Sequence, residues 1–213
     1  MKKFKLRKDL TTDLLGIKLF RIEALISTLI FDKGELGGYV EKEENLNQKG
    51  LSWVHDNALI FGNAYVSGNA HVYDNAHVYG DVRVYGNAHV YDNAHVYGDA
   101  NVYGDALVYG NAHVYGDAYV YDNAHVYGNA CVYDNAHVYD NAHVYGDACV
   151  SGNACVYDNA HVYGDAHVYG DACVSGDVHV SGKAHVYGDA DVSGNALVSG
   201  NAIISSNKKM EGY

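Results

Sequence analysis

The 213-residue sequence has no proline, only four cysteines and no uninterrupted run of roughly 18 apolar residues. The absence of proline argues against rigid linkers and long irregular loops. The absence of an apolar run argues against a helix that crosses a membrane. Four cysteines are too few for a disulfide framework at this length, so we expect free thiols. The basic opening, residues 2–8, leads into charged positions rather than an apolar segment, so we expect no signal peptide and a cytoplasmic location.

Basic residues are scarce between positions 54 and 204, where only Arg83 and Lys183 oppose seventeen aspartates. The whole chain has a formal net charge of −12 at pH 7. Contacts to phosphate require a basic surface, so the composition argues against direct binding of nucleic acid.

An aliphatic residue occupies every sixth position from Val54 to Ile204, which gives twenty-six consecutive hexads. The commonest hexad reads V-Y-G/D-N/D-A-H. Alternation along a short Ala-His-Val strand places Ala and Val on one face and His on the other. One hexad cannot bury its apolar face alone, so the repeat predicts a stacked solenoid with a narrow core of Val and Ala.

The remaining residues of the hexad, Tyr-Gly/Asp-Asn/Asp, are typical of a turn. Gly and Asn readily accept positive φ. An Asp at the second turn position is always followed by Asn. We interpret this pairing as keeping one residue in each turn that can adopt positive φ, while avoiding adjacent charges.

The period, with a small residue four positions after each aliphatic, resembles the hexapeptide-repeat, left-handed parallel β-helix superfamily. The resemblance covers residues 54–204 and implies an all-β triangular prism wound in the left-handed sense. It also implies about 18 residues per coil and about 8–9 coils in total. The GELGGYVEKEENL opening is similar to that of uncharacterised members of this superfamily from bacteria and phages. A bacterial cell or a phage-infected host is therefore the expected setting.

The ends of the chain depart from the repeat. We expect an N-terminal β cap with a degenerate first coil over residues 1–53, the β-helix over 54–204, and a short tail over 205–213. Residues 18–26 alternate like a strand, with Phe20, Ile22 and Ala24 on one face.

Residues one coil apart stack in this architecture, so the outer surface consists of rows. Three rows stand out as candidate binding residues, and they are His71, His89, His125, His143, His161 and His179; Tyr73, Tyr91 and Tyr109; and Asp81, Asp99 and Asp117. Each row has a second explanation. Histidine rows arise automatically when one hexad is duplicated, tyrosine rows stabilise the stack, and aspartate rows keep the rod soluble.

Two function classes remain open. The first is a non-enzymatic acidic solenoid that binds a protein partner or itself, for example as a decoy for a nucleic-acid-binding protein. The alternative, implied by the superfamily, is an acyltransferase that uses a groove between subunits, which requires a homotrimer; a dimer is also open. The uninterrupted hexads single out no catalytic residue, and no cofactor or metal site is predicted. Cys131 and Cys149, and Cys155 and Cys173, are stacked neighbours that we expect to remain thiols.

Overall fold

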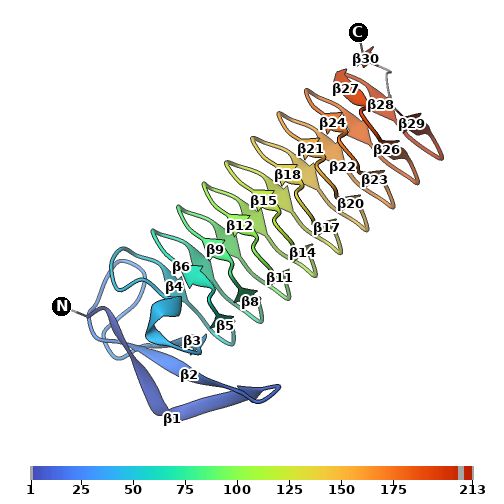
Figure 1. Cartoon of the computed structure of the whole chain (residues 1–213). Helices are drawn as coiled ribbons and strands as arrows, with labels where there is room; N and C mark the ends of the chain where they lie inside the picture. Colours follow the sequence, from blue (N-terminus) through green and yellow to red (C-terminus); the bar gives the residue numbers. More distant parts are fainter. Residues whose placement is uncertain (1, 206–208, 213) are drawn as a thin grey trace.

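The computed structural model is an all-β parallel solenoid of about nine turns (Figure 1). The structure describes residues 2–205 and 209–212, and side chains only through residue 205. Within these ranges the only helical element is one 3-10 turn, η1 (Glu43–Asn45). No helix in the described part of the chain is long and apolar enough to cross a membrane.

Three sheets form the sides of the rod, and we name them A, B and C. Sheet A has 12 strands, which are β1 (Phe4–Leu14), β2 (Ile17–Ala24), β3 (Leu36–Val40), β5 (Leu59–Gly62), β8 (His77–Gly80), β11 (His95–Val96), β14 (His113–Val114), β17 (Cys131–Val132), β20 (Cys149–Val150), β23 (His167–Val168), β26 (His185–Tyr187) and β29 (Ile203–Ser205). Sheet B has 9 strands, which are β6 (Tyr65–Val66), β9 (Arg83–Val84), β12 (Asn101–Val102), β15 (Tyr119–Val120), β18 (His137–Val138), β21 (Cys155–Val156), β24 (Cys173–Val174), β27 (Asp191–Gly194) and β30 (Lys209–Gly212). Sheet C has 9 strands, which are β4 (Trp53–Val54), β7 (His71–Val72), β10 (His89–Val90), β13 (Leu107–Val108), β16 (His125–Val126), β19 (His143–Val144), β22 (His161–Val162), β25 (His179–Val180) and β28 (Leu197–Val198).

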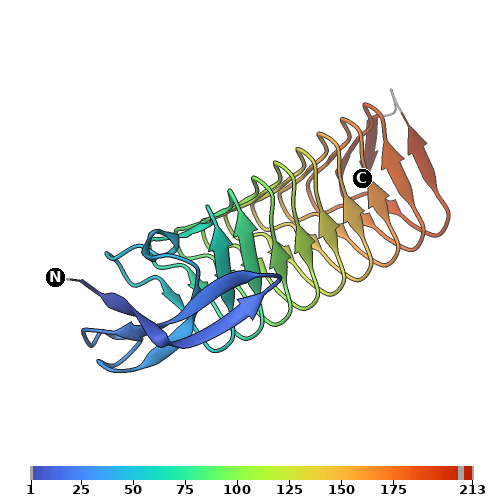
Figure 2. The same cartoon turned by 60° about the horizontal axis from the view of Figure 1, so that its bottom comes forward.

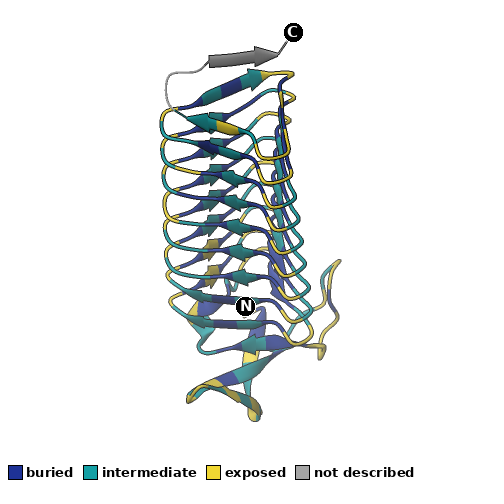
Figure 3. Ribbon diagram, turned by 90° about the vertical axis from the view of Figure 1, so that its right-hand side faces the viewer, coloured by how far each residue is buried: buried dark blue, intermediate teal, exposed yellow. Residues whose placement is uncertain are grey.

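The strands of the repeat pair in parallel and in register. Val90 lies opposite Val72 on one side and Val108 on the other, one coil away in each direction. The predicted core is confirmed: Val90, Val108 and the intervening alanines, such as Ala94, are fully buried. Figure 3 shows this buried interior running the length of the rod. Val and Ala suit this narrow interior because their side chains are short.

One turn residue per hexad adopts positive φ, and it is Gly or Asp rather than Asn. Gly110 has φ +73° and Asp74 has φ +59°, and no described Asn has positive φ. The sequence interpretation therefore placed Asn in the wrong role. The carboxylate explains the choice, because Asp74 Oδ2 accepts the backbone N–H of Asp92 at 3.4 Å and Asp92 Oδ2 accepts that of Gly110 at 3.1 Å. This aspartate satisfies a backbone donor of the next coil.

The asparagines that follow form hydrogen-bonded ladders along the corners of the rod. Asn93 Nδ2 donates to Asn111 Oδ1 at 3.3 Å, Asn111 to Asn129 at 3.1 Å, and Asn129 to Asp147 Oδ1 at 2.8 Å. Ladders elsewhere also end on an aspartate, as where Asn159 donates to Asp177 at 2.9 Å. Each amide donates towards the C-terminus, so a terminal carboxylate accepts the last donor without needing one of its own.

The N-terminal residues build a different structure at the start of the rod (Figure 2). Strands β1 and β2 pair antiparallel, β2 pairs antiparallel with β3, and β3 pairs in parallel with β5 of the repeat. The predicted strand is present, but Leu19 is buried with Ile22 and Ala24 while Phe20 is only half-buried. The pairing of β2 with β3 shifts register between Arg21 and Glu23, and this irregularity breaks the simple alternation.

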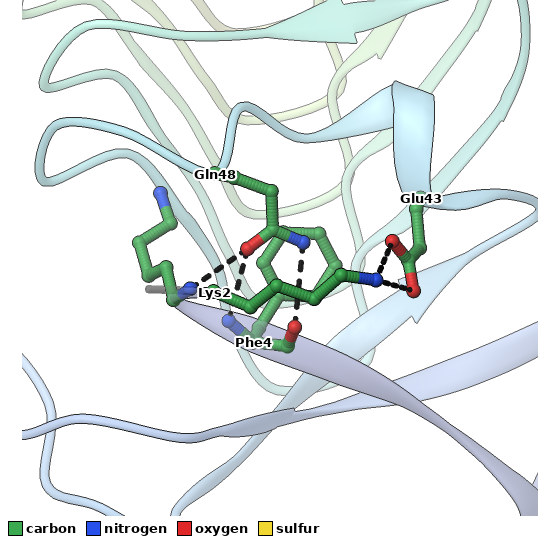
Figure 4. A network of polar contacts seen from close by, with 5 residues as sticks. Lys2, Phe4, Glu43 and Gln48 are labelled. Atoms are coloured by element: carbon green, nitrogen blue, oxygen red, sulfur yellow. Dashed lines mark hydrogen bonds and ion pairs between the residues drawn. The ribbon is translucent and has the colours of Figure 1, made fainter.

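The beginning of β1 is fastened to the loop before the repeat (Figure 4). Gln48 Oε1 accepts the backbone N–H groups of Lys3 and Phe4 at 2.8 and 3.2 Å, and Lys2 pairs with Glu43 at 2.6 Å. The Lys3 side chain is buried and donates to the Ser52 carbonyl at 2.6 Å. Burial lowers the pKa of Lys3 to about 8.

Aromatic contacts complete this junction around Trp53, the first outward residue of sheet C. The Phe31 ring stacks on Trp53 with centroids 4.1 Å apart, and Phe4 contacts it edge-on at 6.4 Å. Trp53 is fully buried as a result. The outward position of sheet C is therefore covered at this end of the rod, whereas Leu197 at the other end is exposed.

Candidate functional site

The histidines of sheet C lie in the row that the sequence predicts. His89 is in register with His71, and His143 with both His125 and His161. The rings in the upper part of the row lie parallel, with centroids 4.8 Å apart for His143 and His161 and 4.9 Å for His161 and His179. The row is continuous except where Leu107 replaces histidine.

The tyrosines form columns at the corners, and the histidines pack against them. Tyr91 and Tyr109 stack with centroids 4.8 Å apart and planes 1° from parallel, and Tyr73 stacks on Tyr91 at 5.0 Å. Tyr109 meets His125 edge to face at 6.4 Å. The predicted tyrosine and histidine rows thus pack against each other as one aromatic surface, interrupted in the histidine row by Leu107.

Burial favours the neutral form of five histidines in this row. It lowers the pKa of His89, His125, His143 and His161, and it lowers that of His71 to about 4.

The start of the aromatic surface holds a small hydrogen-bonded cluster. His55 Nε2 lies 2.9 Å from His71 Nδ1, and the Tyr73 hydroxyl lies 3.1 Å from His89 Nδ1. These four residues and Ile30 line a shallow hollow. The sequence analysis missed His55, the one histidine outside the outward position. Its signal was available, because it occupies the tyrosine position of the first hexad, one coil before Tyr73.

The acidic row lies at a different corner from the tyrosine row. Asp81, Asp99 and Asp117 occupy the turns between sheets A and B, and they line a hollow with the outward residues of β9, β12 and β15, which are Arg83, Asn101 and Tyr119. Asn63 donates to Asp81 Oδ1 at 3.0 Å. In the described part of the chain, the carboxylates of Asp99 and Asp117 accept no hydrogen bond.

The aspartate rows therefore differ in their local roles. Asp74 and Asp92 occupy positive-φ turn positions, and their carboxylates accept backbone donors. Asp147 ends an asparagine ladder. Among the described residues, the carboxylates of Asp99 and Asp117 accept no hydrogen bond, and in another row those of Asp122 and Asp140 accept none either. The Asp81 row differs in that its three carboxylates line a hollow that also contains an arginine. The structure therefore brings the predicted histidine and tyrosine rows into contact, whereas the predicted aspartate row lies apart from them at another corner.

The N-terminal region and the repeat also differ in their ion pairs. Among residues 2–205, the ion pairs join only N-terminal side chains, as in Lys5 with Glu23 and Arg7 with Asp9. The aspartates of the repeat face the solvent without a cationic partner in this set. No group of three or more His, Cys, Asp or Glu residues in the described ranges is placed to hold a metal ion.

The stacked coils define the chain as a β-solenoid repeat protein. Three of its segments, residues 76–91, 100–116 and 190–206, match the family model described as YdcK beta solenoid repeat. A search of curated proteins found no match. All three matched segments lie in or at the end of the repeat, so the similarity concerns the solenoid and carries no information about residues 1–53.

Proposed function

We propose that this chain is a non-catalytic acidic solenoid that binds a basic protein surface through the row Asp81, Asp99 and Asp117. The supporting observation is that three aspartates on consecutive coils line one hollow, and that the carboxylates of two of them, Asp99 and Asp117, accept no hydrogen bond from the described residues. Asn101 and Tyr119 add hydrogen-bonding groups beside it, and Arg83 is its one cationic neighbour.

The spacing of the charges suits a partner that binds nucleic acid. Residues one coil apart in a parallel solenoid are about 4.8 Å apart. One strand of DNA advances about 3.4 Å per phosphate along the axis. The row therefore presents to a basic surface about 0.7 times the linear charge density of one DNA strand, which supports a decoy role.

Two finer expectations accompany the proposal. The resemblance to the hexapeptide-repeat superfamily implies left-handed winding. A capping role for residues 1–53 agrees with the burial of Trp53 under Phe31. A cap at one end would favour binding through the sides of the rod rather than through end-to-end stacking.

The test uses core histones as the basic, nucleic-acid-binding probe, with affinity measured by fluorescence anisotropy at several salt concentrations. We expect binding that weakens as salt rises and that duplex DNA displaces. The triple variant Asp81→Asn, Asp99→Asn, Asp117→Asn should bind more weakly. Arg83→Gln should bind more tightly, because it removes the cation within the row.

The matched control removes three negative charges elsewhere, by Asp165→Asn, Asp189→Asn and Asp191→Asn. These residues lie outside the hollow. If both triple variants lose the same affinity, net charge rather than the row carries the binding, and the proposed site is wrong. No salt-sensitive binding by the unmodified chain would remove the proposal altogether.

A further inference from the structure

The four cysteines of the chain form two pairs, each in register across neighbouring strands. Cys131 on β17 lies opposite Cys149 on β20 in sheet A, and Cys155 on β21 lies opposite Cys173 on β24 in sheet B. All four are free thiols that are partly exposed on the outside of the rod. The function proposed above makes no use of them.

The side chains of the sheet A pair point the same way. Cys131 Sγ lies 3.8 Å from the Asn129 carbonyl, and Cys149 Sγ lies 3.9 Å from the corresponding carbonyl of Asp147. Parallel side chains on in-register strands repeat at the strand spacing of about 4.8 Å. A disulfide requires Cβ atoms about 3.8 Å apart and crossed Cβ–S bonds. The solenoid therefore holds the sheet A pair close together in a geometry that disfavours a disulfide, and in-register pairing places Cys155 and Cys173 at the same strand spacing.

We propose that each cysteine pair binds one soft monovalent cation, Cu(I), in linear coordination between the two sulfurs. Metal–thiolate bonds are about 2.3 Å long, so a linear S–metal–S unit spans about 4.6 Å, close to the strand spacing. Thiolates select soft ions such as Cu(I). A linear ion needs only two ligands, which is compatible with the absence of larger ligand groups among the described residues.

The two pairs differ in their surroundings. In sheet B, burial raises the pKa of Cys155 to about 11 and also raises that of Cys173. The ligand is the thiolate, so each pair must release its protons when it binds the ion.

The neighbours in each row differ as well. His113 precedes Cys131 and His167 follows Cys149, so imidazole nitrogens flank the sheet A pair on both sides. The sheet B pair lies between His137 and Asp191. These side chains are not required as ligands in the proposed geometry, and this makes them useful controls.

The binding step involves no change of oxidation state. Each thiol of a pair releases its proton, two sulfur–copper bonds form, and copper remains Cu(I). Two neutral thiols and one cation become a bis-thiolate complex with one net negative charge, and two protons go to the solvent. Binding should therefore weaken as pH falls.

The experiment is an anaerobic titration of the full reduced chain with Cu(I) in competition with a chromophoric Cu(I) chelator. We expect two equivalents per chain. Cys131→Ser with Cys149→Ser should remove one equivalent, and Cys155→Ser with Cys173→Ser should remove the other. X-ray absorption of the first equivalent should report two sulfur neighbours. Thermal unfolding followed by circular dichroism verifies that each serine variant is folded, because serine is close to cysteine in size and these positions are partly exposed.

The controls are His113→Gln and His167→Gln, which should leave the stoichiometry unchanged. Three results would overturn the proposal. The variant with all four cysteines replaced could still bind Cu(I), or the coordination shell of copper could be dominated by nitrogen. The unmodified chain could also bind a single equivalent that is lost in each of the two double variants. Ready closure of Cys131 and Cys149 into a disulfide under oxidised glutathione, detected by peptide mapping, would contradict the geometry on which it rests.

Discussion

The N-terminal residues and the repeat are stabilised in opposite ways. Before Val54, each important contact occurs once: Phe31 on Trp53, Lys3 with Ser52, and Gln48 with the start of β1. After it, the same contact occurs in every coil, because Val and Ala are buried at almost every inward position. The N-terminal region therefore depends on a few large side chains, while the repeat depends on the match between neighbouring coils.

The largest effect is expected for Val126→Asp in the middle of the repeat. Val126 is fully buried between Val108 and Val144. The substitution removes an apolar contact and places an unpaired charge in the core, which should cost at least about 5 kcal/mol. Thermal unfolding of the variant and of the control Val126→Ala measures the difference. An unchanged melting temperature for Val126→Asp would mean that this side chain does not face inward.

Trp53→Ala tests the junction between the N-terminal region and the repeat by removing one buried side chain. Loss of its stacking with Phe31 and its edge contact with Phe4 should cost about 3–5 kcal/mol, characteristic of a buried aromatic. Limited proteolysis should then cut residues 2–53 while the coils beyond β7 stay protected. Equal loss of protection at both ends of the chain would show that the two regions unfold as one unit.

A pair of glycine substitutions compares the regions directly. Gly16, at the tip of the β1–β2 turn, and Gly110, in the repeat, have φ of +85° and +73°. A Cβ at Gly16 meets nothing within 4 Å, whereas one at Gly110 lies 2.9 Å from Gly128 N. Gly16→Ala should cost about 1 kcal/mol and Gly110→Ala about 2 kcal/mol. Chemical denaturation gives both values, and equal costs would mean that coil stacking adds no constraint.

Acid should weaken the start of the repeat through His71. The pKa of His71 falls to about 4 in the folded chain, mainly through burial. Below pH 6.5 the unfolded chain binds a proton that the folded chain does not, so stability decreases as pH falls from about 6.5 to 4 and changes little from this source beyond. His71→Gln should reduce that acid sensitivity by about 1–2 kcal/mol. His143→Gln, at a more exposed place in the row, should do so by less; equal effects would contradict the role of burial.

The smallest effect is expected at the end of an asparagine ladder. Asp147→Asn replaces a charge-assisted acceptor of Asn129 with a neutral one, so the cost should be below about 1 kcal/mol. Asn111→Leu, inside the ladder, should cost more because it leaves both a donor and an acceptor without partners. Urea denaturation of the two variants distinguishes them. A larger loss for Asp147→Asn would mean that charge, not ladder continuity, matters.

The sequence predicts the repeat well because one physical constraint acts on every hexad. A period of six with Val and Ala fixes which side chains face inward, and the coil length then fixes the rows, so that His89 pairs with His71 as expected. The turn residue that adopts positive φ was harder to predict from the sequence. Asp74 adopts positive φ because its carboxylate reaches a backbone donor of the next coil, and that contact exists only once the coils are stacked.

The N-terminal region lacks such a constraint. Leu19 replaces Phe20 in the core because pairing with β3 shifts by one residue, and nothing local in the sequence specifies the shift. His55 was not predicted as a site residue because it occupies a position of the tyrosine column and not of the histidine row. The Asp81 row was predicted by position, but the sequence does not show that Asp81 accepts a hydrogen bond from Asn63 while Asp99 and Asp117 accept none from the described residues.

The in-register stacking of coils also has a mechanical consequence. A force along the rod loads all the backbone hydrogen bonds between two neighbouring coils at once, such as those from His89 and Tyr91 to Ala106 and Val108. The coil at the end of the stack must therefore detach as a unit. Each detached coil of about 18 residues replaces a rise of about 4.8 Å with an extended chain of roughly 60 Å. When the molecule is stretched between its ends, its length should therefore increase in nearly equal steps, one for each coil that detaches.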